Sequence, residues 1–196
     1  MHSIERYSKS EQRLLLDLAR DAVACGVQGL EPERPVGVSV PAALEKQRAC
    51  FVTLKINGHL RGCIGNLEAN CSLADAVLNN SYLAAFRDQR FDPVSAAELD
   101  QLEYEISVLT PLVPLPVSSE SDLLTKIRPF VDGLVFEAEG RRATFLPSVW
   151  DQLRQPKQFL RQLRLKAGLA PDYWSDAVQC WTYQAIKIGE AASDPG

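Results

Sequence analysis

The sequence predicts an α+β fold with an antiparallel sheet. Asn57-Gly58 separates two runs rich in β-branched and aromatic residues, and this dipeptide is the strongest short signal for a two-residue hairpin turn. Residues 102–108 alternate apolar and polar side chains, which is typical of a half-buried strand. Capped amphipathic segments lie on either side of these strands, so we expect helices that pack beside the sheet.

The first elements follow from capping signals. Ser8 and Glu11 resemble a capping box, and the apolar residues after them recur at helical spacing as far as Cys25. Gly26 is therefore the expected C′ residue of the first helix. A second cap signature predicts a helix over residues 72–86, and the hairpin lies between these two helices.

Three prolines after the alternating strand, Pro111, Pro114 and Pro116, break regular structure and mark the best linker candidate. The pattern beyond them predicts a helix over 121–127, strands over 133–138 and 142–146, a helix from 156 to near 168, and a closing strand over 181–188. The helix from residue 156 carries a basic stripe that we expect to be solvated rather than to contact an acidic partner: Lys157, Arg161 and Arg164.

The hairpin brings an arginine and a thiol together. A two-residue turn sets Leu54 opposite Arg61 and Val52 opposite Cys63, so both side chains share the apolar face of the sheet. Cys50 is expected on that face as well, diagonal to Cys63 and too far away for a disulfide. Burying an unpaired guanidinium is costly, so Arg61 is expected to meet a partner carboxylate, a cleft or both.

Residues 60–65, LRGCIG, are the most distinctive stretch of the chain. Further motifs accompany it in a fixed order: FVTL at 51–54, AAFRD at 84–88, RF at 90–91, ISVLTP at 106–111, TFLP at 144–147, Trp150, KAGL at 166–169 and Trp174. This ordered set resembles the AMME chromosomal-region (AMMECR) domain family, whose bacterial and archaeal members are called AmmeMemoRadiSam system protein A. The resemblance runs from about residue 10 to about residue 188.

The resemblance implies two unequal α+β subdomains with a cleft between them, in which the larger holds both termini and the smaller is inserted. The prolines and the return to strand at Trp181 place the larger subdomain at 1–113 and 172–196, and the smaller at 114–171. The resemblance also implies that the signature side chains line the cleft: Leu60, Arg61, Gly62, Cys63, Ile64 and Gly65. The family's bacterial name implies Memo-like and radical-SAM partners, and the family has no settled reaction.

Cys63 and Arg61 are the candidate catalytic residues. Cys63 is either a reactive thiolate favoured by Arg61, about 6–7 Å away along the strand, or a small buried hydrophobe. His59 lies about 13 Å along the strand from Cys63, whereas a catalytic dyad needs hydrogen-bond reach of about 3 Å. A papain-like mechanism is therefore not expected.

Arg61 is also the first candidate for ligand binding, because its planar fork suits a carboxylate or phosphate. The alternative is a structural salt bridge, for which the sequence offers Glu68, Asp88 or Glu105. A charged cluster at the end of the second helix either caps it in solvent or lines the cleft: Arg87, Asp88 and Arg90.

Composition narrows the class of protein. The chain has 196 residues, of which 46% are hydrophobic, and its net charge of −4 disfavours a nucleic-acid binder. The sequence shows no apolar run long enough for a membrane span and no secretory signal, so neither is expected. Its five cysteines include no C-x-x-C pair, which is typical of a reduced, cytoplasmic protein. Two histidines give no metal-ligand spacing, and no nucleotide fingerprint is present, so neither metal nor cofactor is expected.

Two hypotheses of function remain open. In the first, the protein is a binding module whose cleft holds a protein segment or a small molecule, beside Memo-like and radical-SAM partners. In the second, it is an enzyme or sulfur carrier that uses Cys63, activated by Arg61. The binding module is favoured slightly, because no general base is visible near Cys63.

Overall fold

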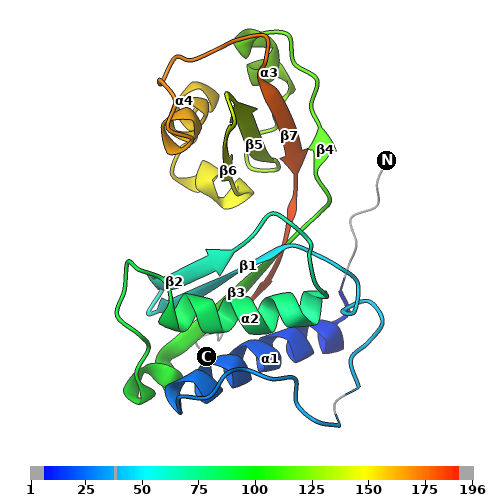
Figure 1. The fold of residues 1–196 in the computed structure, drawn as a ribbon, viewed down its shortest axis with the longest axis vertical. Coiled ribbons are helices and arrows are strands. Elements are labelled where there is room, and N and C mark those ends of the chain that lie inside the picture. The colour runs from blue at the N-terminus through cyan, green and yellow to red at the C-terminus, as the bar shows by residue number, and fades with distance from the viewer. Residues whose placement is uncertain (1–6, 38, 190–196) are drawn as a thin grey trace, which may run out of the picture. The chain divides into compact units, whose positions relative to one another are not determined.

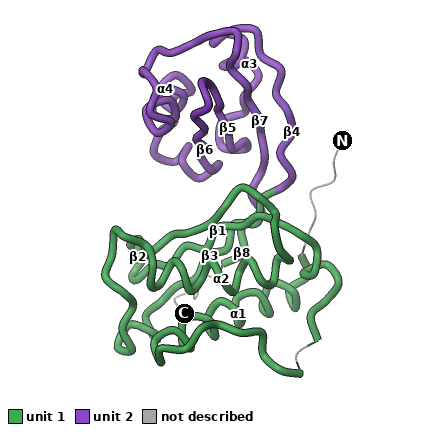
Figure 2. The backbone as a smooth tube through the Cα atoms, in the orientation of Figure 1, with its two compact units in different colours: residues 1–109, 186–196 green, residues 110–185 purple. Residues whose placement is uncertain are grey.

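The computed structural model describes residues 7–37 and 39–189 and confirms the α+β class (Figure 1). The chain divides into two compact units, unit 1 (Met1–Leu109 with Ile186–Gly196) and unit 2 (Thr110–Ala185), as coloured in Figure 2. Each unit contains a four-stranded sheet and a hydrophobic core of its own. No helix among the described residues is both long and apolar enough to cross a membrane.

The sheet of unit 1 has the strand order β2-β1-β3-β8. Its strands are β1 (Cys50–Ile56), β2 (His59–Gly65), β3 (Leu102–Leu109) and β8 (Ala185–Gly189). The hairpin predicted at Asn57-Gly58 joins β1 to β2, and both turn residues have positive φ, 52° and 73°, as a type I′ turn requires. The alternating strand is also confirmed, because the apolar residues of β3 are buried and Glu103 between them is exposed.

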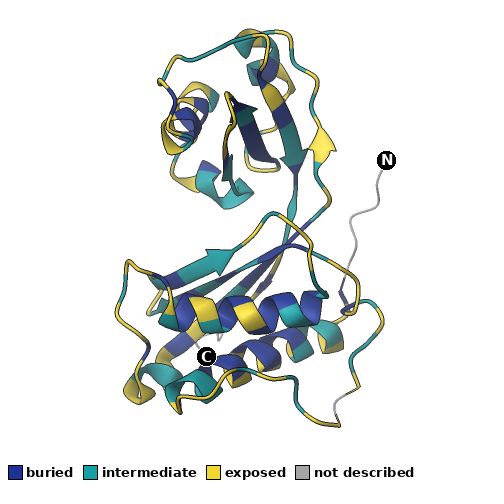
Figure 3. Ribbon diagram, in the orientation of Figure 1, coloured by how far each residue is buried: buried dark blue, intermediate teal, exposed yellow. Residues whose placement is uncertain are grey.

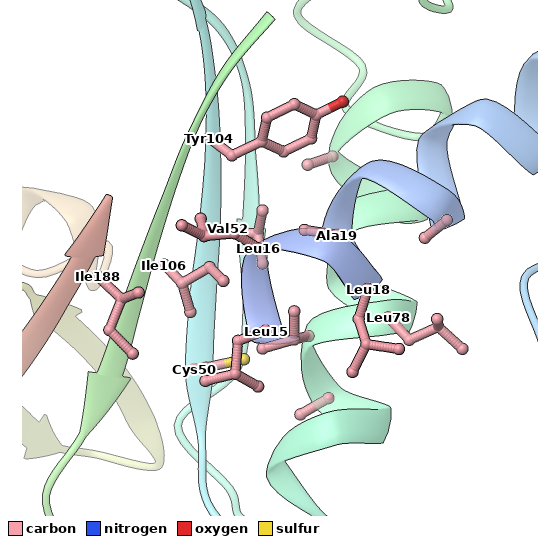
Figure 4. Close-up of a cluster of buried hydrophobic side chains, with 14 of the residues drawn as sticks. Leu15, Leu16, Leu18, Ala19, Cys50, Val52, Leu78, Tyr104, Ile106 and Ile188 are labelled. Carbon is pink, nitrogen blue, oxygen red and sulfur yellow. The ribbon is translucent and has the colours of Figure 1, made fainter. Parts of the chain in front are cut away.

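Two helices, α1 (Lys9–Val27) and α2 (Leu73–Phe86), cover one face of this sheet, and the short 3₁₀ helix η1 (Ala96–Gln101) precedes β3 (Figure 1). Their buried faces appear dark in Figure 3. Leu15 and Leu16 of α1 lie with Val52 and Ile106 of the sheet in one buried hydrophobic cluster (Figure 4). The Ser8 capping box at the start of α1 is confirmed.

The predicted end of α1 at Gly26 is wrong. The helix continues through Gly26 to Val27, and the residue with positive φ after it is Gly29, at 77°. Gly26 is needed inside the helix for packing, because a Cβ there would lie 2.1 Å from the ring of Phe86 on α2. A packing glycine and a capping glycine are indistinguishable in a single sequence.

Unit 2 has the strand order β4-β7-β5-β6. Its elements are β4 (Val113–Pro114), α3 (Glu120–Lys126), β5 (Gly133–Ala138), β6 (Arg141–Phe145), the 3₁₀ helix η2 (Pro147–Asp151), α4 (Pro156–Lys166) and β7 (Gln179–Tyr183). Trp150 and Phe159 stack at the centre of its core, with ring centroids 3.8 Å apart.

The closing strand predicted over 181–188 is two strands in different sheets. β7 pairs with β5 of unit 2, whereas β8 belongs to the sheet of unit 1. Gln184 separates them, and its N–H donates to Oγ1 of Thr110 at 2.8 Å while its carbonyl accepts from the Thr110 N–H at 2.9 Å. The chain therefore leaves unit 2 beside the point where it entered, at Ala185, which differs from the boundary at residue 171 that the prolines suggested.

The basic stripe on α4 is solvated only in part. Lys157 and Arg161 are exposed, but the side chain of Arg164 is only 2% exposed. Its Nη2 donates to Glu120 at 2.8 Å, and the rings of Phe136 and Trp174 lie 5.7 and 5.8 Å from its guanidinium carbon. Ion pairing and two aromatic faces compensate for the burial of this charge.

Candidate functional site

A β-bulge in the signature strand β2 changes the predicted register. Lys55 pairs with Leu60 and Leu54 pairs with Gly62, so Arg61 is an extra residue between the two pairs. The prediction that Leu54 faces Arg61 is therefore wrong. A bulge depends on what packs against the strand, and the turn dipeptide alone carries no signal for it.

The bulge moves Cys63 to the other face of the sheet. Cys63 pairs with Thr53, and Val52 pairs with Ile64. Because paired residues share a face and neighbours alternate, Cys63 lies opposite to the face that Cys50 and Val52 contribute to the core. The predicted apolar surroundings of Cys63, and its predicted position diagonal to Cys50 on the same face, are thus wrong.

The two glycines of the signature are explained by packing. A Cβ on Gly62 would lie 2.2 Å from the Ala84 carbonyl oxygen of α2, and a Cβ on Gly65 would lie 2.5 Å from the Cys50 carbonyl oxygen. Neither backbone could move away without shifting a whole element. Ile64 packs against the core of unit 1. These three positions therefore serve the fold.

The segment after α2 covers the free edge of β2 at Cys63. Oδ2 of Asp88 accepts the Cys63 N–H at 2.9 Å, and Nη2 of Arg90 donates to the Cys63 carbonyl at 3.4 Å. Asp88 and Arg90 also pair with each other at 2.6 and 2.9 Å, and only 5% of the Asp88 side chain is exposed. Hydrogen bonds from Arg90 are the main cause that lowers the pKa of Asp88 well below its usual range. The carboxylate is thus ionised and fixed in place.

Arg61 meets a carboxylate, as expected, but that carboxylate is Glu98 of η1. Nε and Nη2 of Arg61 donate to Glu98 at 2.6 and 3.2 Å, and this bidentate bond is the main cause that lowers the pKa of Glu98 to about 2. The remaining nitrogen, Nη1, is buried without a hydrogen-bond partner among the described residues. The guanidinium carbon lies 6.0 Å from the centre of the Phe91 ring.

An open depression of about 450 Å³ lies beside this pair and is lined by Arg61, Gln89, Arg90, Phe91 and Asp92. The structure thus brings together two predicted site residues with three that sequence reasoning missed. All five belong to unit 1. The cleft between subdomains that the resemblance implies stays a prediction.

The other candidate residues lie apart from this depression. Arg87 is the exposed C-cap residue of α2, and Leu60 is 44% exposed on β2. Glu68 and Glu105, the other candidate partners of Arg61, are bonded to Asn70 and Lys55 instead. Glu98 also caps η1, since its Oε2 accepts from the Oγ and the N–H of Ser95 at 2.8 and 2.9 Å, but this local pattern carries no signal for its pairing with Arg61.

Cys63 is half-buried, and its sulfur accepts a hydrogen bond from Oγ1 of Thr53 at 3.3 Å. The guanidinium of Arg61 is held by Glu98, whereas the guanidinium of Arg90 donates to the Cys63 carbonyl. Among the described residues, no three His, Cys, Asp or Glu side chains gather in an arrangement that could hold a metal ion.

Comparison with known proteins identifies the family. The AMMECR1 family model matches residues 16–188, nearly the whole chain. This chain belongs to the AMMECR1 family. A protein of Methanothermobacter thermautotrophicus is 38% identical over 184 residues, covering 91% of this chain and 93% of that protein. Protein MJ0810 of Methanocaldococcus jannaschii is 36% identical over 155 residues and 75% of each chain.

A solved structure of an archaeal protein supports the same fold. The crystal structure of the uncharacterized protein PH0010 from Pyrococcus horikoshii superimposes with a TM-score of 0.83 at 30% sequence identity. The match covers 92% of this chain and 91% of that one, so it extends over both units. The resemblance seen in the LRGCIG motif and its flanking motifs is thereby confirmed at the level of family and fold.

Proposed function

We propose that this AMMECR1-family protein is a binding module whose depression on unit 1 takes an acidic group of a small molecule or of a protein segment. The observation that carries the proposal is the convergence of two guanidiniums on one ring. The guanidinium carbons of Arg61 and Arg90 lie 6.0 and 5.5 Å from the centre of the Phe91 ring in the wall of the depression. Ligand-binding sites often combine apolar and aromatic side chains with a few charged groups such as an arginine guanidinium.

Arg90 is the group that a ligand would reach first. More than half of its side chain, 56%, is exposed, and its bonds to Asp88 and to the Cys63 carbonyl use Nε and Nη2. Nη1 then remains for a ligand, since a guanidinium carries five N–H donors. Asp88 holds the guanidinium in one orientation, and such a preorganised donor loses less entropy on binding.

The partners of the module belong to the same proposal. The family's bacterial name associates it with a Memo-like protein and a radical-SAM protein, and a protein segment of either is a candidate occupant of the depression. The rival hypothesis, an enzyme or sulfur carrier based on Cys63, gains no support from Arg61, because its fork is bonded to Glu98.

Titration of the full chain with a purified Memo-like protein from the same genome tests the proposal by calorimetry. Phe91→Ala and Arg61→Ala should weaken binding about tenfold or more, since each removes a wall of the depression. Cys63→Ser should bind as the wild type does, with unfolding curves recorded for every variant. The proposal fails if Cys63→Ser abolishes binding while Phe91→Ala retains it. Fast alkylation of Cys63 that is lost in Arg61→Ala would instead favour the cysteine-dependent enzyme.

A further inference from the structure

We infer that the ligand of the depression is a zwitterion that presents an ammonium group beside its acidic group, as an amino acid or a short peptide does. This inference rests on the function proposed above and names its ligand class. It follows from the charges that line the depression.

Both arginines of the depression are already neutralised. Arg61 is paired with Glu98 at 2.6 Å, and Arg90 is paired with Asp88 at 2.6 Å. Both carboxylates have lowered pKa values because of these hydrogen bonds, so they stay ionised at neutral pH. Neither pair therefore offers a net positive charge to a ligand, although the exposed Arg90 still offers N–H donors at Nη1.

Asp92 is the remaining charge of the lining. It is exposed, and among the described residues its carboxylate has no hydrogen bond or ion pair. Asp88 and Glu98 do not line the depression, but they neutralise its two arginines, so these ion pairs together with Asp92 carry one net negative charge, while Gln89 is neutral. The local charge is negative, and it disfavours a phosphate or any other ligand with several negative charges.

A ligand that carries both charges fits this lining. Its carboxylate would accept from Nη1 of Arg90, and its ammonium would lie at Asp92, where it cancels the unpaired charge. The volume of about 450 Å³ has room for an amino acid or a short peptide, and Phe91 offers an apolar surface to its carbon atoms. Two sources share this chemistry, a free amino acid and a peptide with both ends free.

NMR titration of the full chain tests the inference through the backbone amides of residues 89–92. The probes are leucine, glutamate and lysine, each also as the N-acetyl derivative without an ammonium and as the amide without a carboxylate. Dileucine tests the peptide source, and inorganic phosphate tests a purely anionic ligand. We expect at least one free amino acid or the dipeptide to bind, and each derivative to bind about tenfold more weakly.

The variant Asp92→Asn tests whether Asp92 recognises the ammonium group of the ligand. It should weaken the free zwitterion about tenfold but should not weaken its N-acetyl derivative, which has no ammonium for Asp92 to meet and whose carboxylate is repelled less once the Asp92 charge is removed. The matched control is Asp100→Asn, an exposed carboxylate on η1 outside the depression, which should change neither.

The outcomes distinguish this inference from the proposed function. If N-acetyl derivatives or phosphate bind as well as the free amino acids, the inference that the ligand is a zwitterion is overturned, whereas the proposal that the depression binds an acidic group stands. If the amides bind as well as the free amino acids, the acidic group is not recognised and the proposed function fails too. If no probe binds at about 10 mM, weaker than the usual range for specific sites, the inference is rejected and the proposed function rests on the partner titration alone.

Discussion

At the scale of single residues, the LRGCIG signature serves two purposes. Gly62 and Gly65 allow close backbone approach, and Arg61 forms one wall of the depression. The sequence indicated correctly that a guanidinium on this strand needs a carboxylate, since an unpaired buried charge is costly. It could not name Glu98, 37 residues away, because that choice depends on the bulge and on where η1 lies.

Replacing Gly62 tests the packing role of the signature. Gly62→Ala places a methyl group 2.2 Å from a backbone oxygen of α2, and overpacking of this kind costs about 1–3 kcal/mol of unfolding free energy. We expect a lower midpoint in urea unfolding. The matched control is Gly189→Ala on β8, where the nearest atom to a Cβ is 3.8 Å away and little change is expected. Equal stability of the two variants would contradict this account.

At the scale of elements, patterns with a local cause were predicted and those set by a distant neighbour were not. The Ser8 cap, the hairpin turn and the alternation of β3 depend on adjacent residues, and all three are confirmed. The length of α1 depends on Phe86 of another helix, and the division of β7 from β8 depends on Thr110. Local sequence patterns could therefore predict neither the end of α1 nor the division between β7 and β8.

The free edge of β2 illustrates how an element is protected. An edge strand offers unpaired N–H and carbonyl groups to other chains, and proteins often block them with charged side chains. Here Asp88 and Arg90 occupy both backbone groups of Cys63. These residues thus keep the edge closed on one side and position Arg90 for the depression on the other.

Asp88→Asn should open this edge locally. The asparagine keeps one acceptor oxygen but loses the charge that strengthens its bonds to Arg90 and to the Cys63 N–H. We expect hydrogen exchange of the Cys63 amide to become about tenfold faster, equivalent to about 1.4 kcal/mol, while the amides of α1 keep their protection. Asp92→Asn, close by in sequence but outside the bond to Cys63, serves as the control. An unchanged Cys63 amide would show that Asp88 does not protect the edge.

At the scale of the whole molecule, the two units have separate sheets and separate cores. The second unit begins at Thr110, next to the prolines at 111, 114 and 116 that interrupt regular structure. The return was harder, since β7 and β8 are divided only at Gln184 and read as one strand in the sequence. Which sheet a strand joins is decided by pairing, and pairing is not a local property.

Unit 2 should fold on its own when expressed as residues 110–185. Its ends lie together, joined by two hydrogen bonds between Thr110 and Gln184, and its core is built around the stacked rings of Trp150 and Phe159. We expect a cooperative urea transition and a near-ultraviolet circular dichroism signal from the buried tryptophan.

The matched control for that fragment is residues 114–171, the boundaries that the prolines suggest. This shorter piece lacks β7, which lies between β4 and β5 in the sheet. Without it, β5 loses a hydrogen-bonded neighbour and the core loses Cys180, so the piece should remain unfolded. A folded 114–171 fragment would show that β7 is dispensable, and an unfolded 110–185 fragment would show that unit 2 depends on the rest of the chain for its stability.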